Sequence, residues 1–388
     1  AARLHAPQHL ARPAANAQRP FVALPRHLLQ RPPTKIHRVH RVQLVGAIAH
    51  VQLGIVGICL CGQDLLVVHL VYRHLYLQGQ DTRGLLFCQG MRPDIEEQGH
   101  LDPREEAETF VFRLSLRRIA TEYGVFPTSV RSIRTISGSL TGEGNPLNEK
   151  REDRAKWAEG LAVKTFSEEM EILYFPGCYL SYDPRLKKVA VATVRILKKA
   201  GINFGILGNK ENCCGESIRK TGDEELFKRL AKENIKTFID NGVKKVLVSS
   251  PHCYHTFKNE YPEFMVHFEV VHIAHYLLEL IDKGQLELTK EINRQVTYHD
   301  PCYLGRHNGE YGAARNVLAA LPGVELHEMD RSMGDALCCG GGGGNLFTDV
   351  IGNGPESPAR ARAAEALDTS ADILAVSCPS CAVMLADA

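Results

Sequence analysis

The residues best suited to chemistry are five cysteines in the last third of the sequence: Cys302, the adjacent pair Cys338 and Cys339, and the two cysteines of the turn Cys378-Pro379-Ser380-Cys381. Thiolate ligands select zinc, copper(I) or iron-sulfur clusters among the metal centres of proteins. One tetrahedral zinc ion uses only four ligands, so five cysteines exceed what it needs. An iron-sulfur cluster is therefore the first expectation, and a structural zinc site is the alternative.

The same layout of cysteines occurs once before. Cys178 is followed after 34 residues by Cys213 and Cys214, as Cys302 is followed after 35 residues by its own pair. Ser250-Pro251-His252-Cys253 then matches Cys378-Pro379-Ser380-Cys381, at a repeat distance of about 125 residues. An internal repeat of this kind indicates a duplicated structural unit. Because Ser250 stands at the position of Cys378, the first copy offers four cysteines instead of five.

This pattern resembles the cysteine-rich CCG domains of the heterodisulfide reductase catalytic subunit and of iron-sulfur subunits that serve glycolate, lactate and glycerol-3-phosphate oxidation. The resemblance covers residues 130 to 388. It implies that each copy is an α/β domain and that a complete five-cysteine set holds a noncubane [4Fe-4S] cluster. Carried over by position, the implied ligands are Cys302, Cys338, Cys339, Cys378 and Cys381 in the second copy, and Cys178, Cys213, Cys214 and Cys253 in the first. For the first copy a cubane cluster, a modified cluster and no cluster all stay open.

Alternating strands and helices must position these cysteines. In the first copy the apolar pattern predicts strands at 172–175, 202–207 and 243–249 and helices at 186–200, 224–240 and 273–281. In the second copy it predicts strands at 296–299, 324–326 and 373–376 and helices at 312–320 and 358–367. Such alternation is typical of a parallel sheet with crossover helices, and ligands of open α/β sheets lie at the carboxyl ends of the strands. We therefore expect an α/β fold with two pseudo-symmetric units and short parallel sheets.

Composition divides the chain into four expected segments. Residues 1–105 hold nine of the 17 histidines and have Lys35 as their only lysine, so they form an atypical segment that is either disordered or non-native. Its apolar run 44–61 is interrupted by His50 and Gln52 and falls short of a membrane-spanning helix, and Cys59, Cys61 and Cys88 are expected to be incidental thiols. Residues 106–168 form a helical connector with a short helix at 150–159.

The two cysteine-rich units are expected at 169–290 and 291–388. The first continues for about thirty residues after Cys253 and includes the helix at 273–281, whereas seven residues follow Cys381. We therefore expect the second unit to be truncated at its C-terminal end, without a last strand and helix.

Other residues near the cysteines are candidates for supporting roles. Gly340, Gly341 and Gly342 open a run of five glycines whose backbone N–H groups can approach inorganic sulfide, whereas a phosphate loop would continue with Lys and Ser or Thr. His299, Asp300 and His307 are the candidate catalytic residues, because histidine titrates near neutral pH and can supply a proton. The alternative for His299 and Asp300 is a capped turn at a strand end.

Charge and motif content limit the function further. A net charge of +1 gives no reason to expect a nucleic-acid partner, and twelve cysteines in 388 residues suit a reducing cytoplasm better than a small secreted disulfide scaffold. No dinucleotide or flavin fingerprint is present, so hydride chemistry would need a partner.

The resemblance implies electron transfer from a flavoprotein or ferredoxin-like partner to a disulfide, quinone or 2-hydroxy-acid system, including disulfide cleavage at the second cluster. The alternative is a non-catalytic relay subunit of a glycolate or lactate oxidase. The expected location is the cytoplasm, with peripheral association at the inner face of the membrane as a variant.

Overall fold

The computed structural model describes residues 131–348, 354 and 356–388. The expectations for the N-terminal segment, for Cys59, Cys61 and Cys88, and for the first part of the connector lie outside these described residues. Within them, no helix combines the length and the apolar character that crossing a bilayer requires.

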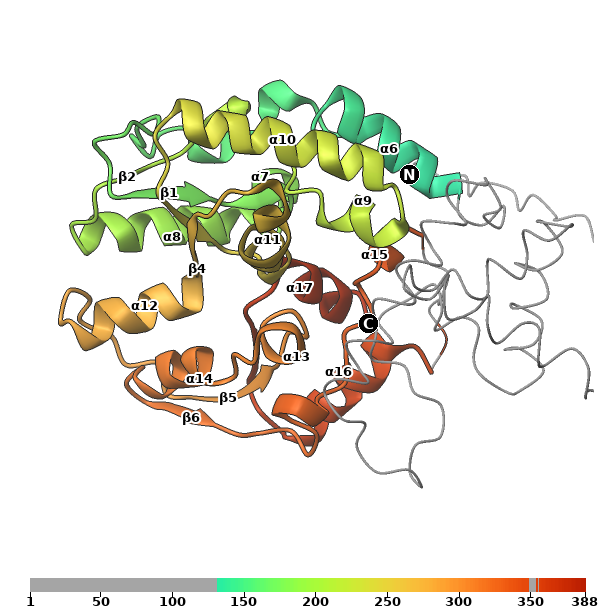
Figure 1. Ribbon diagram of the computed structural model, residues 1–388. Coiled ribbons are helices and arrows are strands. Elements are labelled where there is room, and N and C mark those ends of the chain that lie inside the picture. Colours follow the sequence, from blue (N-terminus) through green and yellow to red (C-terminus); the bar gives the residue numbers. More distant parts are fainter. Residues whose placement is uncertain (1–130, 349–353, 355) are drawn as a thin grey trace, which may run out of the picture. The chain divides into compact units, whose positions relative to one another are not determined.

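The first unit is built on a parallel sheet with the strand order β2-β1-β3-β4 (Figure 1). The strands are β1 Ile172–Phe175, β2 Phe204–Gly205, β3 Lys245–Val248 and β4 Glu269–His272. All four residues of β1 are buried, because this central strand is covered on both faces. Continuous apolar sequence of this kind is typical of parallel strands.

Helices cover both faces of this sheet. On one face, α10 Glu224–Asp240 buries Phe227, Leu230 and Phe238 in the same cluster as Phe175. On the other face, α8 Lys187–Lys199 and α12 Ile273–Asp282 pack against Ile172 and Tyr174. Figure 1 shows β1 between α10 and α8. Both helices were predicted from their apolar spacing, and α10 has the predicted bounds.

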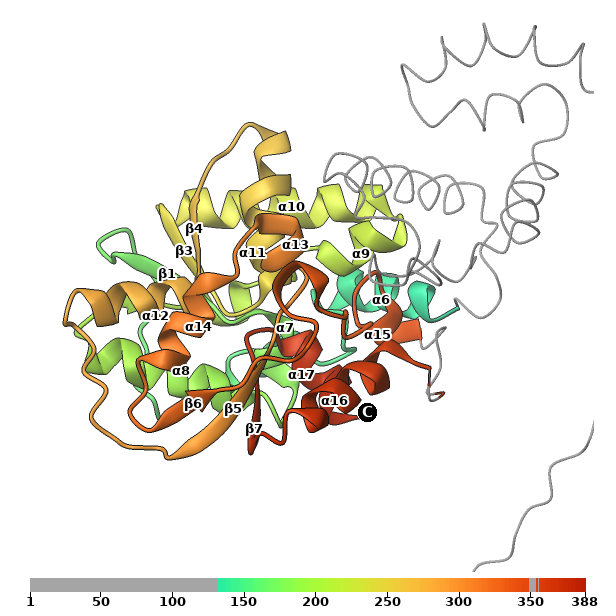
Figure 2. The ribbon, with the colours of Figure 1, turned by 90° about the horizontal axis from the view of Figure 1, so that it is seen from below.

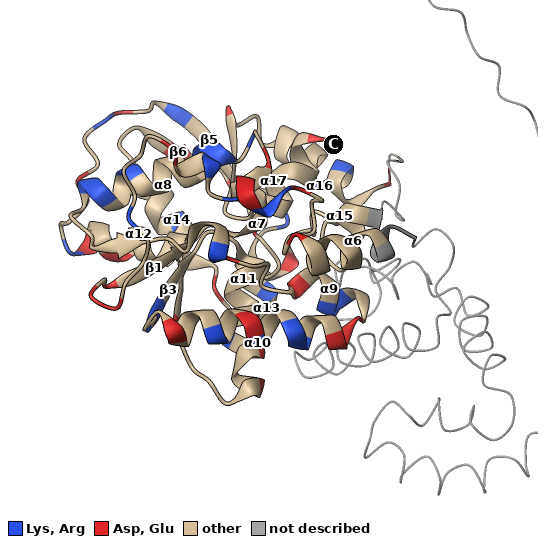
Figure 3. Cartoon of the chain, turned by 90° about the horizontal axis from the view of Figure 1, so that it is seen from above, with Lys and Arg blue, Asp and Glu red and all other residues tan. Residues whose placement is uncertain are grey.

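The start of α10 follows from its local sequence. The Asp223 carboxylate accepts the N–H of Leu226 at 3.0 Å, and Glu224 and Glu225 stand in the first turn, where the helix dipole favours negative charge. Along the outer face, acidic and basic side chains alternate (Figure 3), with ion pairs such as Lys228–Glu225 at 2.8 Å. This face is therefore a solvated one.

The second unit repeats the arrangement with the strand order β6-β5-β7. Its strands are β5 Arg294–His299, β6 Val324–Leu326 and β7 Ile373–Val376, all parallel, and its longer helices are α14 Gly312–Ala319, α16 Pro358–Asp368 and α17 Pro379–Ala386. Figure 2 shows the three strands side by side. β5, β6 and β7 correspond to β1, β2 and β3, and no counterpart of β4 is found among the described residues.

The repeat extends to individual hydrogen bonds. The hydroxyl of Tyr174 in β1 meets the Ser249 hydroxyl at 3.0 Å, and that of Tyr298 in β5 meets the Ser377 hydroxyl at 2.6 Å. Each serine follows the counterpart strand, β3 or β7. The expected α/β fold with two repeated units is therefore confirmed.

Short helices follow most of the cysteine loops, and sequence periodicity did not predict them. They are α7 Gly177–Tyr182, α9 Glu216–Thr221, α11 Pro251–His255 continued by η6 Thr256–Glu260 and η7 Tyr261–Phe264, α13 Gly305–Asn308 and α15 Asn345–Thr348; single turns are η5 Gly208–Lys210 and η8 Met333–Asp335. Elements of four to six residues are too short to show a helical period.

The connector differs from its prediction. It contains helix α6 Arg131–Gly142, but the helix expected at 150–159 is wrong, since two 3-10 turns, η3 Arg151–Asp153 and η4 Lys156–Ala158, occupy this stretch. Between them the N–H of Ala155 donates to the Asn209 side chain at 3.1 Å, and Arg154 forms an ion pair with Glu211. These tertiary bonds replace the backbone bonds of a continuous helix.

Candidate metal centre

The five cysteines of the second unit converge at the carboxyl edge of its sheet. The Sγ atoms of Cys339 and Cys381 are 3.2 Å apart, and those of Cys302 and Cys338 are 3.9 Å apart. All five are free thiols, and all but the half-buried Cys302 are buried. Three distant loops thus place soft ligands in one small volume, as the sequence predicted.

Backbone N–H groups point at the sulfurs of this set. Gly340 donates to the Sγ of Cys338 at 3.3 Å, and Cys381 donates to the Sγ of Cys378 at 3.5 Å from the first turn of α17. Cys378 is the N-cap of α17, with Pro379 as the first helical residue. Hydrogen bonds to thiolate sulfur stabilise negative charge and raise the reduction potential of an iron-sulfur centre.

The glycine run lets this loop approach the cysteines. Gly340 has a φ of +77°, which an L side chain rarely adopts. A Cβ on Gly341 would lie 2.8 Å from Cγ of Met384 in α17 and 3.7 Å from the Sγ of Cys339. The carbonyl of Gly342 accepts the N–H of Asn345 at 3.2 Å and so closes the loop.

His299 is the polar side chain that the structure brings to this set. A ring nitrogen and the sulfurs of Cys339 and Cys381 all lie within 4.8 Å of one another. Nε of Arg362 donates to Nδ1 at 3.2 Å, so the proton of the neutral ring is on Nε2, which is buried and has no hydrogen-bond partner among the described residues. Burial, with the Arg362 charge, lowers the pKa of His299 to about 4. The ring is therefore a neutral donor near pH 7.

Asp300 and His307 make other contacts. The carboxylate of Asp300 accepts from Arg315 at 2.6 and 2.8 Å and from the N–H of Met333 at 2.8 Å, which ties β5 to α14. The ring of His307 lies against Tyr303, at 4.4 Å between centroids, and burial lowers its pKa to about 3. Their catalytic roles stay predictions.

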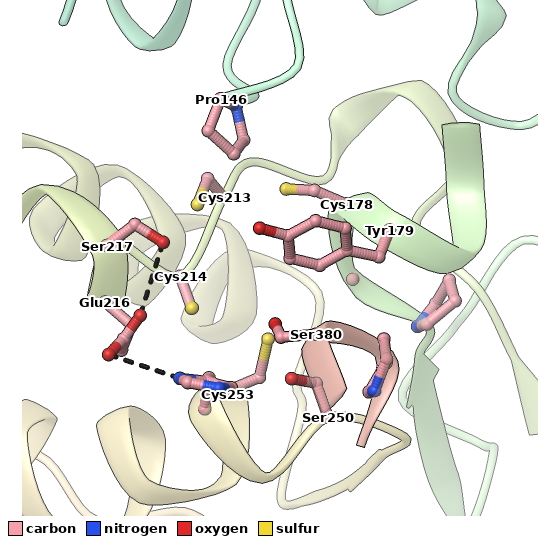
Figure 4. Close-up of a pocket in the computed structure, with 14 residues that line it drawn as sticks. Pro146, Cys178, Tyr179, Cys213, Cys214, Glu216, Ser217, Ser250, Cys253 and Ser380 are labelled. Atoms are coloured by element: carbon pink, nitrogen blue, oxygen red, sulfur yellow. Dashed lines mark hydrogen bonds and ion pairs between the residues drawn. The ribbon is translucent and has the colours of Figure 1, made fainter. Parts of the chain in front are cut away.

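The four cysteines of the first unit share one cavity. Cys178, Cys213, Cys214 and Cys253 are buried and line a space of about 400 Å³ including its open mouth. Figure 4 shows their sulfurs around the space into which the Tyr179 hydroxyl points. The N–H of Gly215 donates to the Sγ of Cys213 at 3.4 Å, as Gly340 does to Cys338.

Ser250 lines the same cavity and is the N-cap of α11, as Cys378 is of α17. The first set therefore has an oxygen where the second has a fifth sulfur.

Arg154 from the connector also reaches the first set, which sequence reasoning missed. Its Nη2 lies 3.6 Å from the Sγ of Cys178 and 2.6 Å from Glu211, and the side chain is 2% exposed. A buried cation beside a thiolate offsets part of its negative charge. No motif signalled this contact, because Arg154 is one of several arginines in a charged stretch.

The two units also exchange side chains. His252, from the loop of the first set, contacts Cys378 of the second set and lies 3.2 Å from Glu216. Burial alone lowers the pKa of His252, but Glu216 and Cys378 outweigh it and raise the pKa to about 10. The hydroxyl of Tyr303 donates to Glu216 at 2.6 Å, and Tyr179, its counterpart, contacts Ser380. The position of a tyrosine directly after each first cysteine was the available sequence signal.

The donor chemistry fits an iron-sulfur cofactor. Nine free cysteines in two groups are more than structural zinc ions require, and backbone N–H groups point at sulfur in both. The unpartnered Nε2 of His299 is a further donor beside the second group. These residues supply what an anionic, sulfur-bound cluster requires.

Comparison with known proteins agrees with this geometry. The cysteine-rich CCG domain family matches residues 172–258 and 296–386. The chain is 40% identical over 258 residues to a probable iron-sulfur-binding oxidoreductase, FadF, of Bacillus subtilis, which covers 64% of this chain and 36% of that protein. It is 37% identical over 255 residues to the EtfAB:quinone oxidoreductase of Syntrophomonas wolfei, covering 63% and 36%.

A third relative belongs to the dihydromethanophenazine:CoB--CoM heterodisulfide reductase of Methanosarcina barkeri, of which it is one component chain. It is 38% identical over 252 residues, covering 63% of this chain and 59% of that protein. The chain thus spans between about a third and three fifths of the length of these relatives. No solved structure matches it. The matched residues, the duplicated sheets and the two cysteine sets together show that the chain belongs to the CCG cysteine-rich domain family and carries this domain twice.

Proposed function

We propose that this protein is an iron-sulfur oxidoreductase subunit that passes electrons between a flavoprotein or ferredoxin-like partner and a disulfide- or quinone-type acceptor. The observation that carries this proposal is the convergence of Cys302, Cys338, Cys339, Cys378 and Cys381 as free, largely buried thiols at one sheet edge. The relatives named as iron-sulfur, quinone and heterodisulfide oxidoreductases support it.

In this proposal the five cysteines of the second unit hold a [4Fe-4S] cluster of the noncubane type, and the four cysteines of the first unit hold a second cluster. Such clusters accept and donate single electrons. Cys302 is the one ligand of the second set that is half-exposed, so an acceptor approaches on its side. Ser250 makes the first set unsuited to a five-cysteine cluster.

The protein's own groups adjust the charge of each set. Beside the second set, the N–H of Gly340 and the neutral Nε2–H of His299 favour added negative charge. Beside the first, Arg154 does the same with a full positive charge. Because added electrons are stabilised by such donors, we expect both sets to be held at higher potential than bare thiolate sites would be.

A relay function without disulfide chemistry is the second candidate. The contact of His252 with Cys378, and that of Tyr179 with Ser380, join the two sets through side chains across the units. Such a continuous connection favours electron passage through the protein to a flavin-containing partner.

Metal analysis tests the proposal most directly. Anaerobically purified protein should contain iron and acid-labile sulfide, and Cys339→Ser should lose roughly half of the iron, because one of two clusters loses a ligand. Cys88→Ser, a cysteine outside both sets, is the matched control and should keep all of it. Zinc without iron or sulfide would overturn the proposal.

Kinetics separates the two candidate functions. Reconstituted protein with an artificial electron donor should reduce a small disulfide if the second set is catalytic. Unchanged disulfide, together with rapid electron exchange with a flavoprotein, would favour the relay.

We further propose that the two units extend over 169–290 and 291–388 and that the protein works in the reducing cytoplasm, with or without a membrane-bound partner. The free state of the nine cysteines in the described residues supports a reducing environment. Limited proteolysis with mass mapping tests the boundaries.

A further inference from the structure

The two counterpart strands β3 and β7 have different neighbours. β3 lies between β1 and β4 and is buried over Val246–Val248, whereas β7 pairs only with β5. β7 has the equally apolar sequence Ile-Leu-Ala-Val but is half-buried, and Ile373 is 42% exposed. An apolar parallel strand with an open edge is a ready template for another strand.

The direction of the free backbone groups follows from the pairing. The N–H of Asp372 donates to the carbonyl of Gln295 at 2.9 Å, toward β5. Because successive residues of a strand alternate in direction, the N–H groups of Ile373 and Ala375 point to the opposite, open edge. No other strand pairs with that edge in the part of the chain that the structure describes.

Helix α8 presents a second apolar face next to this edge. Its residues Ala190, Val194 and Leu197 are buried against the first sheet. Val189, Ala192 and Ile196 lie on another side of the helix, at helical spacing, and line a cavity of about 320 Å³. The other walls come from α12, α14, β7 and the start of α17. Val189 is 43% exposed, so this apolar face is open.

The repeat shows what such a surface receives. In the first unit, β4 pairs with β3 and leads directly into α12, and α12 packs on α14 of the other unit. α14 is the counterpart of α8, and β3 is the counterpart of β7. A strand and helix placed by the same symmetry would therefore pair with β7 and cover Val189, Ala192 and Ile196.

We propose that the groove formed by α8 and the free edge of β7 binds a strand–helix segment with the chemistry of Glu269–Asp282, an apolar parallel strand followed at once by an apolar helix. Cys378 lines the same cavity, so the bound segment also covers this cysteine from the side of α8. The proposal holds whether or not the cysteines bind a cluster.

A peptide of residues 266–284 added to the full chain tests this. Hydrogen exchange resolved to single residues should slow about tenfold or more at the amides of Ile373 and Ala375, because a new strand would accept their hydrogen bonds. The amides of Leu374 and Val376, which face β5, should change less.

Matched variants identify the groove. A peptide carrying Val271→Asp and Leu277→Asp should give no protection, because both changes place charge on the apolar side of the segment. In the protein, Ala192→Glu should abolish the effect, and Arg195→Glu, on the exposed side of α8, should leave it unchanged. Binding that survives Ala192→Glu would overturn the proposal.

A fused segment guards against a peptide that associates with itself. Cys381 aligns with Cys253, so Ala388 aligns with Glu260, and a copy of residues 261–284 appended after Ala388 continues the repeat in register. The fusion should protect Ile373 and Ala375 and raise the Tm, and the Ala192→Glu version should do neither. If peptide and fusion both fail, or if the unmodified chain is a dimer that already protects these amides, the proposal is wrong.

Discussion

At the residue scale, one ring distinguishes the two cysteine sites. His299 at the end of β5 aligns with Phe175 at the end of β1, so the second set has an N–H donor where the first has an aromatic hydrocarbon. Both side chains are fully buried. The asymmetry places a polar group beside the cysteines for which the resemblance implied substrate chemistry.

Replacing His299→Phe should lower the reduction potential of the second cluster while leaving the first unchanged. The lost N–H donor stabilises the more negative, reduced state, and about 1.4 kcal/mol of difference corresponds to roughly 59 mV for one electron. Redox titration followed by electron paramagnetic resonance measures it.

The reciprocal Phe175→His serves as the comparison, and His299→Gln, which keeps an N–H donor, should recover part of the potential. An unchanged potential in His299→Phe would show that the ring is only structural.

The single-atom difference at Ser250 leads to a second residue-scale prediction. Ser250→Cys should convert the first set to five sulfurs, because its N-cap position in α11 matches that of Cys378 in α17. We expect the Mössbauer and paramagnetic resonance spectra of the first cluster to shift toward those of the second, with added iron per chain of about zero to one cluster.

Ser250→Ala is the control and should keep the original spectra, since it adds no ligand. Spectra identical in Ser250→Cys and Ser250→Ala would show that the first set does not recruit a fifth cysteine.

At the scale of elements, the glycine loop and α17 must fit closely around Cys339 and Cys381. Gly341→Ala should destabilise the second unit by about 1–3 kcal/mol and reduce its iron content, because the new methyl group would overlap Met384. Thermal unfolding and iron analysis measure both effects.

The double variant Gly341→Ala with Met384→Ala should recover cluster content, since the smaller side chain makes room. Gly334→Ala is a matched control, because the nearest atom to its added Cβ is the Tyr311 hydroxyl at 3.9 Å. A Gly341→Ala variant with normal iron would show that the loop tolerates the shift.

At the scale of the whole molecule, several histidines are buried in neutral form, and acid should destabilise the fold through them. His272, at the end of β4, is 0% exposed, and its Nδ1 accepts the N–H of Ala274 at 3.3 Å. Burial, with the charge of His275, lowers its pKa to about 3.

Since an unfolded histidine titrates near 6.5, the unfolded chain binds a proton that the folded chain does not between these values. The stability associated with His272 is therefore complete above pH 6.5 and is lost as the pH falls toward 3, by up to about 1.4 kcal/mol per pH unit.

His272→Asn should flatten this acid limb, because its side-chain oxygen can still cap Ala274 without titrating. Urea unfolding of cluster-free protein from pH 7 to pH 4 measures it, with the exposed His267→Asn as control. Parallel pH profiles for wild type and His272→Asn would contradict the assignment.

The sequence by itself determined the elements with strong local signals. The strand Ile373–Val376 and the helix Glu224–Asp240 have the predicted bounds, because a short apolar run between turn residues and a 3.6-residue period are local properties. The cysteine sets could also be predicted, since ligand number and spacing are properties of the chain.

Only the tertiary structure decided which side chains surround those cysteines. Arg154 beside Cys178, Glu216 between His252 and Tyr303, and His252 against Cys378 join residues that are far apart in the sequence, and the last of these contacts joins the two units. Their spacing along the chain follows no period, because it depends on how two sheets meet at their carboxyl edges. The charge around each set of cysteines therefore comes from packing, whereas the sets themselves come from the sequence.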